Sequence, residues 1–124
     1  MNAEQVQPST IIESKWLTVD GLRVHYLTAG KSGSPVVLLH GAGIDSAHLS
    51  WAEAIESLAQ EHRVYAPDLP GYGQSDRPDV QYNAEFYIAF LAHLLDAWQL
   101  PKASLVGLSM GGAIVLGFTL AHPE

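Results

Sequence analysis

Hydrophobic and polar residues alternate in two short runs near the start of the chain, at residues 12–19 and 22–27. Asp20-Gly21 lies between them, and this dipeptide favours the type I′ turn of a β-hairpin, whose two central residues need positive φ. We therefore expect the first two strands to pair antiparallel. A third run, PVVLLH at 35–40, is continuously apolar. It is long enough for a buried strand and too short for a helix.

Helical and strand patterns alternate along the rest of the chain. The segment SWAE at 50–53 matches a capping box and predicts a helix that begins there, with residues 51, 54, 55 and 58 on its apolar face. Asn83 is a suitable N-cap for a second helix, which ends before Pro101 and turns residues 87, 91, 94, 95 and 98 inward. The other expected elements are strands at 62–67 and 103–108, a helix at 110–122, and a Gly/Pro-rich loop at 68–78.

This order of elements predicts an α/β fold. Alternation of strands and helices after the opening hairpin indicates right-handed crossovers and a mostly parallel sheet with helices on both faces. Ligands of such sheets bind beyond the carboxyl ends of the strands. The polar residues 1–10 are expected to be a flexible N-terminus, and residues 11–124 to belong to one domain.

Composition narrows the possible functions. The formal net charge is −7, which disfavours nucleic acid or an anionic membrane surface as a partner. The chain has no cysteine, which excludes disulfides, thiolate zinc sites and a cysteine nucleophile. No cluster of metal ligands stands out, so we expect neither a metal nor a cofactor. The first residues lack the basic start and apolar run of a signal peptide, and a cytoplasmic location is expected.

Residues 103–121 form an uncharged run that is long enough to span a bilayer. Three glycines crowd its centre, however, and no aromatic belt or positive flank frames it beyond Lys102. A buried parallel strand that runs into a buried helix gives the same pattern. We therefore expect a strand and a helix and no membrane span.

The strongest chemical signal is GLSMG at 107–111, a G-x-S-x-G between an expected strand and an expected helix. A strand that turns directly into a helix forces Ser109 into a strained backbone conformation, and only glycine lets the neighbouring backbone pass so closely. The turn exposes the Ser109 hydroxyl as a candidate nucleophile. The Met110 amide at the helix N-terminus is then free to hold developing negative charge. The alternative is a glycine-rich turn with an idle serine.

A second signal, HGAG at 40–43, follows the third strand directly. Its glycines let a backbone amide point into the cleft. We expect the Ala42 amide to pair with that of Met110 as an oxyanion hole. The alternative is an ordinary loop with a structural histidine, and for His40 itself a role in bracing the loop is favoured over proton transfer.

These motifs, with DLPGYGQSD at 68–76, resemble the α/β-hydrolase superfamily, in the branch of esterases, enol-lactone hydrolases, C–C bond hydrolases and proline iminopeptidases. The resemblance runs from about residue 14 to 124. It implies an α/β-hydrolase fold, a nucleophile at Ser109, oxyanion donors near Ala42 and Met110, and structural roles for Asp68 and Ser75. Relatives with an aspartate nucleophile, such as haloalkane dehalogenases and epoxide hydrolases, are disfavoured because serine occupies the elbow.

The chain departs from the family pattern in its missing acid and base. The family's triad runs serine, then acid, then histidine. Only His122 and Glu124 qualify after Ser109, and the intervening helix carries both away from it. His48, just past the oxyanion turn, could lie at the mouth of the cleft. We therefore expect residues 11–124 to be the N-terminal part of one α/β-hydrolase domain, with a bare, apolar edge on the strand at 103–108.

The implied function is a serine hydrolase that cleaves an ester, lactone or C–C bond of a small carbonyl compound through an acyl-enzyme. This activity is expected of the full-length protein, because the chain alone lacks a triad acid and histidine. The alternative is a non-catalytic protein of this fold that binds a small ligand or a partner. An exposed, strained serine argues against that alternative, since a binding protein has no need of one.

Overall fold

The computed structural model describes residues 11–124, and the elements follow the expected order. The flexible N-terminus expected at residues 1–10 lies outside the described residues. The elements are β1 (Glu13–Val19), β2 (Leu22–Ala29), β3 (Pro35–Leu39), α1 (Ala47–Leu58), β4 (Arg63–Pro67), α2 (Ala84–Ala97), β5 (Ser104–Gly107) and α3 (Met110–Ala121).

The opening hairpin has the expected geometry. Strands β1 and β2 pair antiparallel along their whole length, from Glu13 opposite Thr28 to Val19 opposite Leu22. At the turn, Asp20 has φ 53° and Gly21 has φ 78°. Both central residues therefore have positive φ, as a type I′ turn requires.

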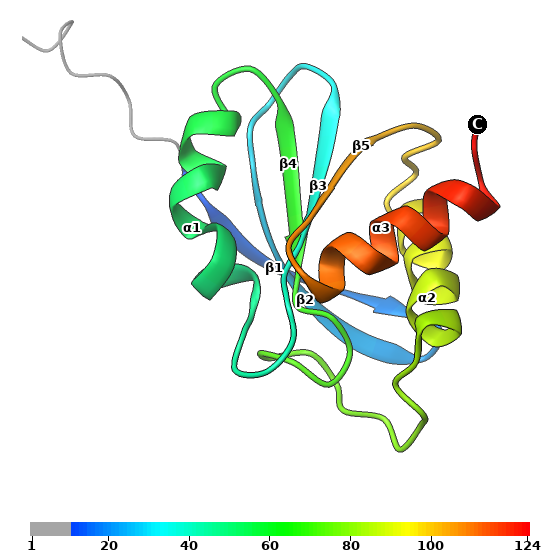
Figure 1. Ribbon diagram of the computed structural model, residues 1–124. Coiled ribbons are helices and arrows are strands. Elements are labelled where there is room, and N and C mark those ends of the chain that lie inside the picture. The colour runs from blue at the N-terminus through cyan, green and yellow to red at the C-terminus, as the bar shows by residue number, and fades with distance from the viewer. Residues whose placement is uncertain (1–10) are drawn as a thin grey trace, which may run out of the picture.

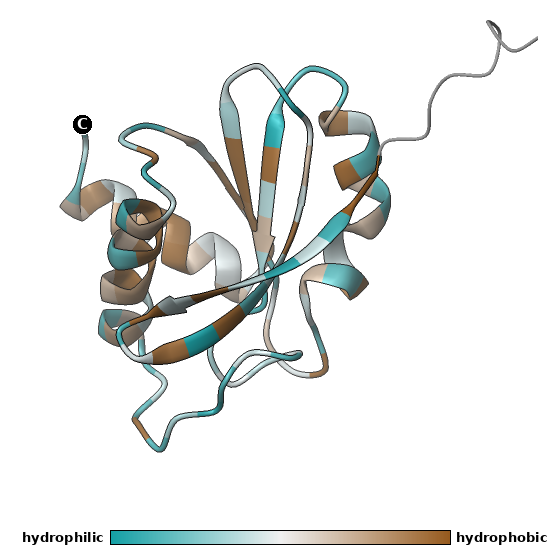
Figure 2. Ribbon diagram, turned by 180° about the vertical axis from the view of Figure 1, so that it is seen from behind, coloured by the Kyte–Doolittle hydropathy of each residue, from teal (hydrophilic) through white to brown (hydrophobic). Residues whose placement is uncertain are grey.

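The five strands form one mixed sheet in the order β1-β2-β4-β3-β5. Strand β3 pairs parallel with β4 and β5, whereas β2 pairs antiparallel with both β1 and β4. Helix α1 covers one face, and α2 and α3 cover the other (Figure 1). The hydropathy colouring shows apolar stretches in the central strands between these helix layers (Figure 2). The residues of β3 alternate between the two buried clusters, so each face has its own core.

Helix α1 begins four residues earlier than the capping box predicted, which makes that expectation wrong. The N-cap is Ser46, whose side chain accepts a hydrogen bond from the Leu49 amide at 3.2 Å. Ser50 lies inside the helix, and its hydroxyl donates to the carboxylate of Asp45 at 2.7–2.8 Å. Two serines could cap this helix by local pattern, and contacts with the preceding loop select the first one.

Helix α2 begins as expected, since the Asn83 side chain accepts a hydrogen bond from the Phe86 amide at 2.9 Å. Its buried face differs from the expected one at two positions, Trp98 and Phe90. Trp98 is only partly buried, because the helix ends at Ala97 and Trp98 is its C-cap. Phe90, which the pattern had not singled out, is 2% exposed and belongs to the core.

Strand β5 is an edge of the sheet, as the sequence predicted. It is shorter than expected, with four residues, and it pairs only with β3 among the described strands. On the neighbouring helix, Leu116 and Leu120 are 62% and 76% exposed. None of the helices within residues 11–124 combines the length and the hydrophobicity needed to cross a membrane.

Candidate active site

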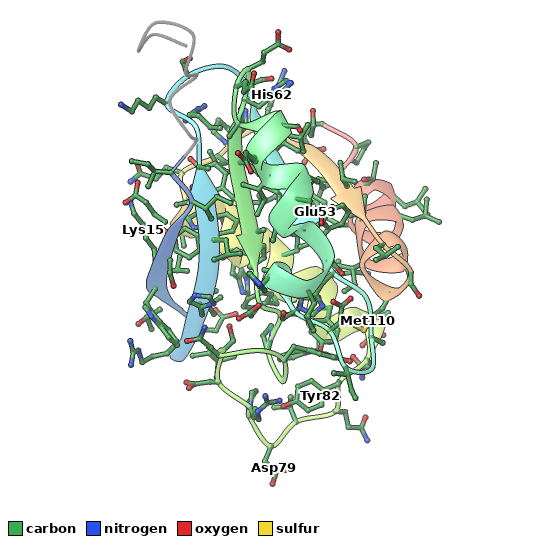
Figure 3. The ribbon with its side chains drawn as sticks, turned by 90° about the vertical axis from the view of Figure 1, so that its left-hand side faces the viewer. Lys15, Glu53, His62, Asp79, Tyr82 and Met110 are labelled. Carbon is green, nitrogen blue, oxygen red and sulfur yellow. The ribbon has the colours of Figure 1, made fainter. Side chains whose placement is uncertain are left out.

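Three segments that carry the sequence motifs meet at one end of the sheet. Strands β3, β4 and β5 run parallel, so the loops that follow them emerge at the same edge (Figure 1). Seen from the side, Met110 lies next to these loops (Figure 3). This is the end of an α/β sheet at which ligands bind.

Ser109 joins β5 to α3 in a backbone conformation that serine rarely adopts. Its φ is 55° and its ψ is −112°, and the residue is exposed. Glycines make the turn possible. A Cβ at Gly107 would lie 2.2 Å from the Gly111 carbonyl carbon, and a Cβ at Gly111 would lie 2.3 Å from the Leu39 oxygen. The expected strained strand-to-helix turn is therefore present, while the catalytic role of Ser109 stays a prediction.

The Met110 amide lies directly beside Ser109 at the positive end of α3. It forms no hydrogen bond with another group in residues 11–124, whereas the next amide, of Gly111, donates to the Leu108 oxygen at 2.9 Å. The first amides of a helix have no partner within the helix and carry partial positive charge. The Met110 amide is thus available to an external anion, as an oxyanion donor must be.

The loop at 40–43 packs directly against the elbow. A Cβ at Gly41 would lie 3.5 Å from the Ser109 Cβ and 3.3 Å from the Leu108 oxygen. The Gly41 amide itself donates to Asp45 Oδ2 at 2.8 Å, which removes it as an oxyanion donor. Ala42, next along the loop, is exposed, and its amide has no acceptor within the described part of the chain. Its place in an oxyanion hole stays a prediction.

His40 braces two loops, as the favoured interpretation held. The side chain is fully buried, its Nδ1 donates to the Gly41 oxygen at 2.7 Å, and its Nε2 accepts from the Leu69 amide at 3.0 Å. The Tyr72 ring packs edge-on against the imidazole at 5.0 Å between centroids. Both ring nitrogens are therefore occupied, which leaves none to move a proton at Ser109.

Asp68 is the hydrogen-bonding centre beneath the site. Its carboxylate accepts from His25 Nδ1 and the Ala47 amide, each at 2.8 Å, and from the Gln74 amide at 3.0 Å. The Ser75 hydroxyl donates to the Asp68 carbonyl oxygen at 2.6 Å and accepts from the His25 amide at 2.9 Å. These contacts tie β2, the start of α1 and the loop after β4 together, in agreement with the structural roles expected for Asp68 and Ser75.

Asp45 organises the loop at residues 40–43 and was missed by the sequence reasoning. Its carboxylate accepts hydrogen bonds from the Gly41 and Ser46 amides and from the Ser50 hydroxyl. Burial alone would raise the pKa of this carboxyl, but these hydrogen bonds, with His40 nearby, lower it below its ordinary value of 3.8. The signal available in the sequence is an aspartate just before a helix N-cap, a position where its side chain bonds the local backbone.

The described residues give Ser109 no hydrogen-bonded general base. The Ser109 hydroxyl makes no hydrogen bond to an imidazole there, and His25 and His93 are bonded to Asp68 and Asp20. His122 follows α3, a 12-residue helix about 18 Å long, so it lies far from the elbow as expected. His48 is exposed in the first turn of α1, and its side chain makes no hydrogen bond within residues 11–124.

Several known proteins with similar sequence or structure are named as hydrolases. The chain is 36% identical over 126 residues to the 2-hydroxymuconate semialdehyde hydrolase of Pseudomonas sp. (strain CF600), across 100% of this chain and 43% of that protein. It is 38% identical over 107 residues to Epoxide hydrolase 4 of Mus musculus, across 84% of this chain and 29% of that protein. The crystal structure of a serine hydrolase involved in carbazole degradation superposes with a TM-score of 0.87, at 36% identity, across 92% of this chain and 45% of that one.

The chain thus spans less than half the length of these relatives. A family model described as the alpha/beta hydrolase fold matches residues 34–124, which include the loop at 40–43, Asp68 and the turn at Ser109. We conclude that the chain belongs to the α/β-hydrolase fold family.

Proposed function

We propose that this chain carries the nucleophile and the oxyanion hole of a serine hydrolase that cleaves small carbonyl compounds through an acyl-enzyme. The observation that carries the proposal is the elbow. Ser109 is exposed at φ 55°, between Gly107 and Gly111, where a Cβ would lie 2.2 and 2.3 Å from neighbouring backbone atoms, and a free amide follows it immediately. A strained backbone persists only when the surrounding structure enforces it.

The reaction would begin with attack of the Ser109 hydroxyl on a substrate carbonyl. The carbonyl oxygen becomes an oxyanion, which the Met110 and Ala42 amides would receive as hydrogen-bond donors. The partial positive charge at the start of α3 favours the same anion. Expulsion of the leaving group then yields an ester on Ser109, which water hydrolyses.

The type of nucleophile favours carbonyl substrates over epoxides, although one relative is named an epoxide hydrolase. Attack of Ser109 on an epoxide carbon would leave an ether on the serine, which water does not cleave at neutral pH. Attack on a carbonyl leaves an ester, which water can release. Esters, lactones and the C–C bonds of vinylogous diketones all present such a carbonyl, and two similar proteins, a semialdehyde hydrolase and a carbazole-degradation hydrolase, support the last class.

The acid and the histidine that complete the triad would come from polypeptide outside residues 11–124. Two facts support this division. No imidazole in the described residues bonds the Ser109 hydroxyl, and the chain spans 43% of the length of the semialdehyde hydrolase that it matches throughout. Without a base, a serine hydroxyl is a poor nucleophile, so turnover is expected of the full-length protein.

Steady-state kinetics of a Ser109→Ala variant of the full-length protein test the proposal. The substrates are an aryl ester, a lactone and a vinylogous 1,5-diketone. We expect kcat to fall by a factor of roughly 10³ or more on the substrate that the protein turns over, as for loss of a triad nucleophile. Ser104→Ala, an exposed serine five residues earlier in β5, is the matched control and should keep its activity.

The competing function is ligand binding without catalysis. It predicts that none of the three substrates is turned over and that Ser109→Ala leaves ligand affinity unchanged. Turnover that survives Ser109→Ala would contradict the proposed nucleophile directly.

A further inference from the structure

A second serine of this chain takes part in a Ser–His–Asp arrangement, away from the elbow. Ser14 Oγ lies 2.5 Å from His25 Nε2, and His25 Nδ1 lies 2.8 Å from Asp68 Oδ2. His25 and Asp68 are 3% and 2% exposed, whereas Ser14 is exposed on β1. The order is that of a nucleophile, a base and an orienting acid, the arrangement that makes a serine hydroxyl reactive.

The hydrogen-bond partners of Asp68 determine where the His25 proton lies. Backbone amides of Ala47 and Gln74 donate to the two carboxylate oxygens, so both oxygens act as acceptors. His25 Nδ1 must then supply the proton that it shares with Asp68. In its neutral form, this imidazole presents the lone pair of Nε2 to the Ser14 hydroxyl, which is the tautomer that a general base needs.

An aromatic surface lies beside this serine. Trp16, two residues along β1 and on the same face, is 40% exposed and stands opposite His25 in the strand register, with 5.1 Å between the ring centroids. The Arg23 guanidinium lies over the Trp16 ring at 4.4 Å. A flat, half-exposed indole next to a nucleophile suits an aryl group of a substrate.

We propose that Ser14 is a second nucleophile, independent of Ser109, which accepts acyl groups from small aryl esters. The Ser14 oxygen forms the bond to the acyl carbon while its proton passes to His25 Nε2. The aryl oxide leaves and takes up that proton, which gives a Ser14 ester and a phenol. Ser14 lies on β1, and Ser109 comes shortly after β5. These two strands are the opposite edges of the sheet, with three strands between them, so neither reaction needs the other serine.

The chain contains its own control, a serine–histidine pair without the acid. Ser34 Oγ lies 3.2 Å from His62 Nδ1, and both residues lie near the protein surface. Within residues 11–124, His62 has no carboxylate partner. Figure 3 shows His62 at one end of the molecule and Lys15, the neighbour of Ser14, on the β1 side. Comparison of the two serines therefore isolates the contribution of the buried Asp68–His25 pair.

Acetylation in a Ser109→Ala background tests the proposal on the serine itself. The full chain is treated with p-nitrophenyl acetate, and the acetylated peptides are quantified by mass spectrometry. We expect Ser14 to be acetylated about a hundredfold faster than Ser34, the low end of the effect of a positioned general base. Equal rates at the two serines, or no acetylation of Ser14, would overturn the proposal, and neither result bears on Ser109.

A cysteine version gives a second, independent readout. Because the chain has no cysteine, Ser14→Cys and Ser34→Cys each introduce a single thiol. A hydrogen-bonded imidazole draws the thiol proton and raises the thiolate fraction, which is the reactive form. We expect Ser14→Cys to react with iodoacetamide at neutral pH at least about tenfold faster than Ser34→Cys. Equal alkylation rates in two folded variants would contradict the role of His25 as a base.

Discussion

Replacing Ser109 by glycine is expected to stabilise the folded chain, although it removes the candidate nucleophile. Ser109 has φ 55°, a region in which a side chain strains the backbone and glycine does not. A residue held in such a region costs about 1–3 kcal/mol. Glycine regains this energy but loses about 0.5–1 kcal/mol through the greater freedom of the unfolded chain. The net gain in the free energy of unfolding is therefore about 1 kcal/mol.

Ser109→Ala is the proper reference, because alanine keeps the Cβ and therefore the strain. Urea unfolding followed by tryptophan fluorescence gives the free energy of unfolding of the two variants, and the melting temperature should rise by about 3–5 °C from alanine to glycine. Ser57 is a solvent-exposed residue within α1 and provides a control of opposite sign. There Ser57→Gly should be less stable than Ser57→Ala by about 1 kcal/mol, because glycine disfavours a helix. A Ser109→Gly variant no more stable than Ser109→Ala would refute the claim that the elbow is strained.

Three further predictions test other parts of the site. Gly111→Ala should destabilise the fold by several kcal/mol or prevent folding, since its Cβ would lie 2.3 Å from the Leu39 oxygen. Gly112→Ala is the control: its Cβ would lie 3.2 Å from the nearest atom, so urea unfolding should show a far smaller loss of stability. Asp68→Ala should cost about 3–5 kcal/mol, because it leaves buried donors without an acceptor, and thermal unfolding measures this loss. Because the folded state lowers the pKa of Asp45, its carboxylate stabilises the fold above pH 3.8 and loses that contribution as the pH falls below 3.8. Asp45→Asn should therefore show a flatter dependence of stability on pH between about 4 and 2, and an unchanged acid profile would contradict this role.

The sequence predicted the parts of the structure that depend on local pattern. Strand and helix order follows from the period of the apolar residues, and the hairpin follows from Asp20-Gly21 with its two positive φ values. The elbow could be predicted because Gly107 and Gly111 lie where a Cβ would collide with neighbouring backbone. Such features involve residues close together in the chain.

Features that depend on distant residues escaped the sequence reasoning. The start of α1 was placed at Ser50 by pattern, whereas the Ala47 amide is held by Asp68, 21 residues later. The bond between His25 and Asp68 joins residues 43 apart. A histidine in an alternating strand and an aspartate in a loop carry no mark of their pairing, because only the packing of β2 beside β4 brings them together.

The region of β5 and α3 likewise combines a feature that the sequence predicted with one that depends on a distant strand. The sequence predicted a bare edge, and the structure leaves Leu116 and Leu120 exposed beside it. The length of the strand was overestimated at six residues, since only four keep the register with β3. Register is set by the partner strand, which the pattern of one strand does not reveal.

The central claim is that Ser109 forms a covalent acyl intermediate, and rapid-quench mass spectrometry of the full-length protein during turnover tests it most directly. The account predicts that the peptide containing Ser109 gains the mass of the substrate's acyl group within a single turnover, and that the Ser109→Ala variant shows neither this adduct nor turnover. Turnover in which this peptide never gains mass, and which survives in Ser109→Ala, would contradict the account.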